Sequence, residues 1–209
     1  MTAKNTILAM DTATGPCSVA LWHEGHIAAY VENQEHTRQS TSLMPMIEQV
    51  LHECDVSYTD LSAVACTVGP GSFTGIRVGL AAASGICFAA ETKGLGFTTL
   101  SVLAYAAAQE SPDADILAIL NAGKGEVYYQ GFNKTSLFEP RVGKIEEAIA
   151  SRPDAIICGK APDAVGSPFP RADALATLAA HHFSDALPLT PYYIREPDAK
   201  PMAEQKAKK

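Results

Sequence analysis

The first third of the chain alternates short apolar runs with turn residues, a pattern typical of strands joined by hairpins. The apolar runs cover residues 6–10, 17–22 and 26–31, and the segments between them (DTATGP at 11–16 and EG at 24–25) carry turn residues. Since short connections join antiparallel neighbours, the pattern predicts a three-stranded antiparallel meander.

Downstream, a regular apolar stripe predicts the first helix. Leu43, Ile47 and Leu51 recur every four residues, with Met46 and Val50 beside them, while polar residues fill the opposite side. This spacing is typical of an amphipathic helix that buries one face.

A buried strand is expected at residues 61–68, followed by a sharp turn at 69–75 and a second helix over 76–90. This second helix has almost no polar face, because the residues of its last three turns (GLAAASGICFAA) are small or apolar on every side. A helix that is apolar all round must be covered all round. One side can lie on the sheet, and we expect a partner protein to cover another.

The second half of the chain resembles a reduced copy of the first. Residues 8–15 (LAMDTATG) correspond to residues 118–125 (AILNAGKG), each an apolar strand that ends in Asp or Asn before a Gly-bearing turn. Further strands are expected at 94–97, 127–132 and 155–158, and further helices at 101–109, 145–150 and 172–183.

This repeat predicts an α/β protein of two lobes, residues 1–109 and residues 110–195, the second of them reduced. The segment 196–209 is polar and rich in lysine. We expect it to be a disordered tail.

Composition and net charge limit the classes of function that can be expected. Over 209 residues, 16 Lys plus Arg against 23 Asp plus Glu give a net charge of −7. A protein that grips nucleic acid by itself usually has a basic surface, so autonomous tRNA or DNA binding is not expected. The hydrophobic share of 47% and charged share of 19% suit a soluble globular protein. We expect no signal peptide and no membrane span, because no apolar run approaches the roughly 20 residues that a span needs.

Five cysteines without a Cys-x-x-Cys pair favour buried, reduced thiols in a cytoplasmic protein rather than zinc or disulfides. Histidines do not suggest a metal site either. His36 has Ser40, not a second histidine, four residues on, and His181 and His182 are adjacent, so they point apart on a helix. No spacing indicates a Ser-His-Asp or Cys-His arrangement.

Two loops are candidates for phosphate chemistry. Asp11 and Thr12 end the first strand, where they can hold hydrated Mg²⁺ and a phosphate; alternatively, Asp11 caps its own turn. The mirrored Asn121 in the second half cannot supply a negative charge. The loop before the second helix either binds an anion at the helix N-terminus or needs its glycines for a tight turn. Its candidate residues are Gly69, Gly71, Ser72 and Thr74.

Several segments resemble the TsaB (YeaZ) family. The strongest are residues 7–21 (ILAMDTATGPCSVAL) and 69–79 (GPGSFTGIRVG), followed in order by 99–103 (TLSVL), 121–128 (NAGKGEVY) and 193–195 (YIR). The resemblance implies a duplicated actin-like ASKHA (ribonuclease H-like) fold. It also implies a non-catalytic partner subunit of TsaD, the subunit that transfers the threonylcarbamoyl group to adenosine 37 of tRNAs reading ANN codons. The ATPase TsaE joins this pair, and tRNA is contacted only indirectly.

In the family, helices of the first half form the heterodimer, which matches the unusually apolar second helix. The predicted interface comprises Leu43, Ile47, Leu51, Gly75, Val78, Gly79, Ala82, Ala83 and Ile86. Without TsaD, the same surface is expected to form a homodimer.

The resemblance has two departures, since the family usually has Asp and Arg where this chain has Asn121 and Gly123. They favour a subunit with no cofactor of its own. The alternative is an ATPase or kinase-like ASKHA enzyme that binds ATP or ADP with Mg²⁺ between the lobes. TsaD itself carries an H-x-x-x-H metal motif, which His36 and Ser40 do not reproduce. A peptidase would need a metal site or nucleophile that the sequence does not offer.

Overall fold

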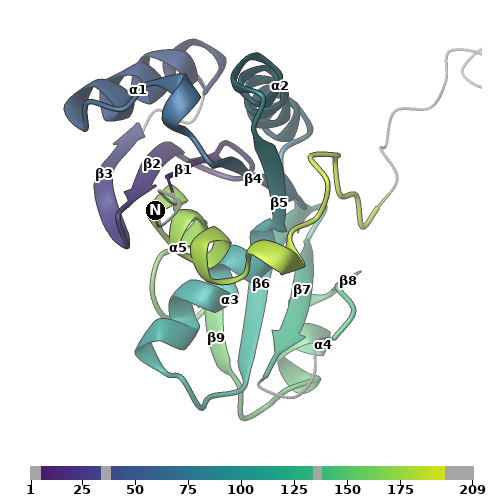
Figure 1. The fold of residues 1–209 in the computed structure, drawn as a ribbon. Coiled ribbons are helices and arrows are strands. Elements are labelled where there is room, and N and C mark those ends of the chain that lie inside the picture. Colours follow the sequence, from purple (N-terminus) through teal and green to yellow (C-terminus); the bar gives the residue numbers. More distant parts are fainter. Residues whose placement is uncertain (1–5, 34–38, 134–137, 196–209) are drawn as a thin grey trace, which may run out of the picture.

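The computed structural model describes residues 6–33, 39–133 and 138–195. Two β-sheets lie one above the other in Figure 1, with α1 and α2 beside the upper sheet, α4 beside the lower one, and α3 and α5 in between. The upper sheet comes from the first half of the chain and the lower sheet from the second half.

The first sheet has five strands in the order β3-β2-β1-β4-β5. Strands β1 (Ile7–Asp11), β2 (Cys17–His23) and β3 (His26–Asn33) form an antiparallel meander, which confirms that prediction. Strands β4 (Ala63–Gly69) and β5 (Lys93–Thr98) continue the sheet parallel to β1. Parallel neighbours need crossovers, and these are α1 (Gln39–Glu53), with the short 3-10 helix Tyr58–Asp60, and α2 (Phe73–Ala90).

The second sheet repeats this arrangement in the order β8-β7-β6-β9. Its strands are β6 (Ile116–Gly123), β7 (Glu126–Phe132), β8 (Arg141–Gly143) and β9 (Ile156–Gly159), with α4 (Ile145–Ala150) before β9. Strand β6 takes the place of β1, since it pairs with an antiparallel hairpin strand on one side and a parallel strand on the other. The duplication is therefore confirmed. Sequence patterning missed β8, because three residues (RVG) carry no periodicity.

Two helices each pack on the sheet formed by the other half of the chain. Helix α3 (Thr99–Glu110) packs against the second sheet, while α5 (Ala172–His181), which precedes the 3-10 helix Phe183–Asp185, packs against the first. Ile7 and Ala9 face away from α1 and α2, and α5 covers this second face of the first sheet. The two lobes expected at 1–109 and 110–195 stay a prediction.

Helix α2 begins at Phe73, three residues before the expected start, because Ser72 caps it: the Gly75 N–H donates to Ser72 Oγ at 3.2 Å. The composition of α2 also bears on the expectation of no membrane span. The 18 residues of α2 have a mean hydropathy of 1.5, enough by length and composition for a membrane span, and 33% of them are buried. However, α2 is the crossover between the parallel strands β4 and β5, and it packs on β4. Crossing a membrane would require it to leave the sheet.

Candidate functional site

The apolar stripe of α1 lies in the hydrophobic core. Leu43, Ile47 and Leu51 are 2%, 0% and 4% exposed, and they pack among side chains of the first sheet. Their side chains cannot reach a second chain in this structure. The stripe covers the sheet of its own lobe, and its place in an interface stays a prediction.

Most of the α2 residues expected at the interface also point inward. Gly75, Gly79, Ala83 and Ile86 are buried. The glycines let α2 approach the turn after β1. Thr12 Oγ1 donates to the Gly75 carbonyl at 2.7 Å, and a Cβ on Gly79 would lie only 2.5 Å from Thr12 Oγ1.

Val78 and Ala82 are half-buried against the core. Together, the nine expected interface residues therefore provide little exposed surface.

The exposed face of α2 consists of other residues, which we call the α2 stripe: Phe73, Arg77, Ala81, Ser84 and Phe88. They follow one another at intervals of four, four, three and four residues, so they lie along one side of the helix. Phe88 is 89% exposed and Phe73 is 43% exposed. Sequence reasoning missed this stripe because a helix that is apolar all round gives no sign of which side its own fold covers.

The carboxyl of Asp11 is sealed inside the first lobe. Its side chain is fully buried, and Oδ1 accepts hydrogen bonds from Thr67 Oγ1 at 2.5 Å and from the Ala13 N–H at 3.3 Å. The other oxygen, Oδ2, has no partner among the described residues. Burial raises the pKa of Asp11 from 3.8 to about 7, although both hydrogen bonds lower it. The bond to Ala13 matches the alternative in which Asp11 caps its own turn.

The loop before α2 packs tightly on that turn. The Ser72 N–H donates to the Ala13 carbonyl at 2.6 Å, and a Cβ on Gly71 would collide with the same carbonyl oxygen. Gly69 has a φ of +111°, which favours glycine. Thr74 is exposed. These contacts support the interpretation in which the glycines serve the turn and the close packing of α2.

A cavity of about 300 Å³ separates these loops from the second lobe, and Thr14, Ser72, Asn121, Lys160 and Phe169 are among its lining residues. The Phe169 ring lies over the turn after β1, since a Cβ on Gly15 would be 2.5 Å from its Cδ1.

A magnesium nucleotide in this cavity would need an accessible carboxylate at Asp11 and open space at Gly15. The buried carboxyl and the Phe169 ring provide neither. The residues present do not fit that group.

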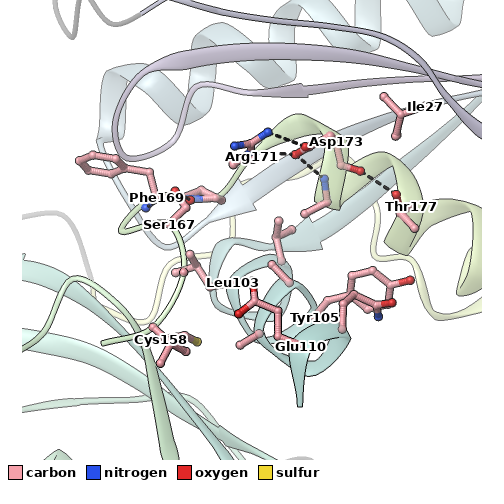
Figure 2. A pocket seen from close by; sticks show the side chains of 18 residues that line it. Ile27, Leu103, Tyr105, Glu110, Cys158, Ser167, Phe169, Arg171, Asp173 and Thr177 are labelled. Atoms are coloured by element: carbon pink, nitrogen blue, oxygen red, sulfur yellow. Dashed lines mark hydrogen bonds and ion pairs between the residues drawn. The ribbon is translucent and has the colours of Figure 1, made fainter. Parts of the chain in front are cut away.

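Figure 2 shows a second cavity, of about 340 Å³, between α3, α5 and residues 165–170. Leu103 and Cys158 line its apolar wall, and the ion pair of Arg171 with Asp173 (Nη2 to Oδ2, 2.7 Å) lies on the opposite side. Thr177 Oγ1 donates to the Asp173 carbonyl at 2.9 Å. Sequence reasoning could not find this cavity, because its walls come from segments far apart in the chain.

Within residues 6–33, 39–133 and 138–195, no three His, Cys, Asp or Glu side chains are grouped to hold a metal ion. His181 Nδ1 is hydrogen-bonded to the Tyr105 hydroxyl at 2.8 Å, and His182 Nδ1 to Asp185 at 3.1 Å. His36 and the expected tail at 196–209 lie outside the described residues.

The repeated sheet arrangement defines the chain as a duplicated, actin-like α/β protein of the ASKHA (ribonuclease H-like) type. Residues 29–184 match the family model described as "TsaD: tRNA N6-adenosine threonylcarbamoyltransferase". The chain belongs to this family, and its relatives place it with the TsaB (YeaZ) proteins.

The sequence similarity to these relatives extends over only part of each chain. The chain is 40% identical over 130 residues to the tRNA threonylcarbamoyladenosine biosynthesis protein TsaB of Escherichia coli (strain K12), covering 61% of this chain and 55% of that protein. It spans 52% to 58% of the length of three such curated relatives.

The solved structures cover more of the chain. YeaZ from Pseudomonas aeruginosa superposes with a TM-score of 0.75 at 25% identity, over 90% of this chain and 99% of that one. A protein described as similar to peptidase YEAZ, from the same organism, gives a TM-score of 0.77 at 25% identity, over 91% of this chain and 100% of that one.

Proposed function

We propose that this chain is a non-catalytic partner subunit that binds TsaD through the α2 stripe. In this role it supports transfer of the threonylcarbamoyl group to adenosine 37 of tRNAs that read ANN codons. The family match and the name of the Escherichia coli relative support the pathway. The exposed face of α2 supports binding to TsaD through this helix.

Phe88 is the observation that carries this proposal. Its side chain is 89% exposed on a helix whose opposite face is packed into the core. Burying a phenylalanine side chain is worth about 1.5–3 kcal/mol, which the fold of this chain alone leaves unused. Aromatic side chains that project from a surface in this way are typical anchors of protein interfaces.

The middle of the α2 stripe suits a helical partner. Ala81 and Ser84, with the neighbouring Gly85, are small and exposed, so a second helix can approach closely. Since this chain itself matches the TsaD family model, a TsaD subunit is expected to share its fold and to have a helix in the equivalent place.

The α2 stripe also supports self-association when TsaD is absent. Phe73 and Phe88 are 15 residues apart, about 22 Å along the helix, and Ala81 lies near the midpoint. An antiparallel pair of α2 helices related by a two-fold axis would bring Phe88 of one copy to Phe73 of the other. A homodimer in the isolated protein follows from this arrangement.

The net charge of −7 supports a division of labour in which other subunits hold the tRNA phosphates. TsaE supplies ATPase activity to the pair, and the complex works in the cytoplasm. The buried Asp11 carboxyl and the Phe169 ring over Gly15 argue against the alternative, an ATP-using ASKHA enzyme with its own nucleotide site.

The test compares two exposed phenylalanines. Phe88→Glu places a charge on the α2 stripe, and Phe138→Glu, at a side chain 40% exposed in the second lobe, is the matched control. We expect Phe88→Glu to abolish co-purification with TsaD and to lower transfer turnover, while Phe138→Glu behaves like the wild type. A folded Phe88→Glu protein that binds TsaD normally would contradict the proposal.

A further inference from the structure

The segment after α5 forms a strap, residues 187–195, across the edge of the first sheet. Leu187 and Gly96 exchange two backbone hydrogen bonds of 2.8 Å, and the Tyr192 N–H donates to the Val68 carbonyl at 2.8 Å. In Figure 1 the strap is the yellow segment beside β5. It therefore covers a strand edge that would otherwise be open to pairing with other chains.

The first lobe is shaped to receive the strap. A Cβ on Gly96 would lie 2.7 Å from the Pro188 carbonyl oxygen, and a Cβ on Gly69 would lie 2.7 Å from the Tyr192 carbonyl oxygen. Two glycines on neighbouring strands thus make room for the strap backbone. This fit fixes the path of the chain toward Tyr193.

Near its end the strap meets the α2 stripe. The Tyr193 ring stacks on the Phe73 ring with centroids 5.9 Å apart and planes 20° apart, and the Arg77 guanidinium lies 3.6 Å from the Phe73 centroid. Tyr193 remains 40% exposed and Phe73 43% exposed. We call these three side chains the Arg77–Phe73–Tyr193 stack.

The residues after Tyr193 anchor the strap to the second lobe. Ile194 packs against the hydrophobic cluster between α3 and the second sheet, and Arg195 forms an ion pair with Glu126 on β7. Tyr193 is therefore held from both sides, by Tyr192 on the first lobe and by Arg195 on the second.

Arg77 differs from three other arginines of the described chain. Arg152, Arg171 and Arg195 each form an ion pair with a carboxylate. Within the described part of the chain, Arg77 forms no ion pair, and its side chain is exposed beside Phe73. Exposed Tyr and Arg side chains beside apolar surface are typical of interface centres.

We propose that the strap is a second element of the partner-binding surface, in which Tyr193 contacts the TsaD subunit and Arg77 pairs with an acidic side chain of that subunit. This inference rests on the proposed function and extends it from α2 to the C-terminal strap. Continuity of the stack with the α2 stripe favours a protein partner. An RNA base stacked on Tyr193 is the competing occupant, and the acidic net charge argues against it.

The test measures the dissociation constant of the full chain for TsaD by calorimetry. We expect Tyr193→Ala to weaken binding about tenfold or more, because aromatic anchors dominate interface energetics. Tyr193→Phe keeps the stacking ring and is expected to bind within about threefold of the wild type. Arg77→Gln leaves the strap contacts intact and is expected to weaken binding, with less dependence on salt. Phe138→Ala serves as the matched aromatic control.

The outcomes separate the two proposals. If the wild type does not bind TsaD, or if Phe88→Glu binds normally, the proposed function fails. If Phe88→Glu abolishes binding while Tyr193→Ala and Arg77→Gln both bind like the wild type, the strap inference alone is overturned. It is also overturned if Tyr193→Ala loses binding to tRNA but keeps its affinity for TsaD.

Discussion

Asp11→Asn is expected to stabilise this protein increasingly as the pH rises. Asparagine keeps an oxygen that can accept the hydrogen bonds from Thr67 and Ala13, while it removes the charge that develops on a fully buried group. The wild-type carboxyl has its pKa raised to about 7 by burial, against 3.8 for an ordinary aspartate. The folded state therefore holds a proton that the unfolded chain releases between these values.

The direction and size of the effect follow from this difference. Between about pH 4 and pH 7 the folded state binds more protons than the unfolded state, so the wild-type free energy of unfolding falls as the pH rises. At about 1.4 kcal/mol for each pH unit, the interval from 3.8 to about 7 corresponds to about 4 kcal/mol. This is a large share of the 5–15 kcal/mol that stabilises a typical domain.

Urea unfolding of both proteins from about pH 4 to pH 8 measures the effect. We expect the stability difference between Asp11→Asn and the wild type to be small at pH 4, to grow toward pH 7 and then to level off. Asp154→Asn, at an exposed aspartate, is the control. An Asp11→Asn difference that is flat with pH, or that shrinks as the pH rises, would refute the reasoning.

Three further predictions concern the Asp11 turn, the strap, and nucleotide binding in the cavity between the lobes. Thr67→Val removes the 2.5 Å hydrogen bond to Asp11, so the pKa of Asp11, followed by carboxyl NMR titration, should rise above the wild-type value. Gly96→Ala should cost about 1–3 kcal/mol in urea unfolding, because its Cβ would lie 2.7 Å from the Pro188 carbonyl oxygen; Gly85→Ala, with nothing within 4 Å, should instead stabilise by about 0.5–1 kcal/mol. Calorimetry with ATP and Mg²⁺ should give no binding heat for the isolated chain, and micromolar affinity would revive the enzyme alternative.

The strands and helices were largely predictable, because their apolar periodicity is local. The meander, α1 and α4 follow directly from spacing along the chain, and the correspondence of 8–15 with 118–125 predicted the duplicated sheets. Helix α5 was predicted as an element but not in its position, since nothing local to residues 172–183 says which sheet its apolar face will cover.

The sequence could place the proposed partner-binding surface on α2, but it could not say which residues of α2 form it. Periodicity marks apolar side chains whether they fill the core, like Ile47, or project into solvent, like Phe88. Tyr193 joins Phe73 from 120 residues away, a contact that spacing cannot reveal. The hydrogen bond that Thr67 donates to Asp11 likewise joins two strands that are far apart in the sequence.

The second lobe is a reduced copy of the first. In the described part of the second lobe, the sheet ends at β9 and has no counterpart of α2 and β5. Among the described residues, no second helix covers the α2 stripe. We propose that another molecule does.

The central claim is that this molecule is TsaD. A photoreactive phenylalanine analogue at position 88, with the same analogue at position 138 as the control, tests it most directly in a mixture with TsaD. The account predicts an efficient cross-link to TsaD from position 88 and none from position 138. Cross-linking from position 138 with none from position 88 would contradict it.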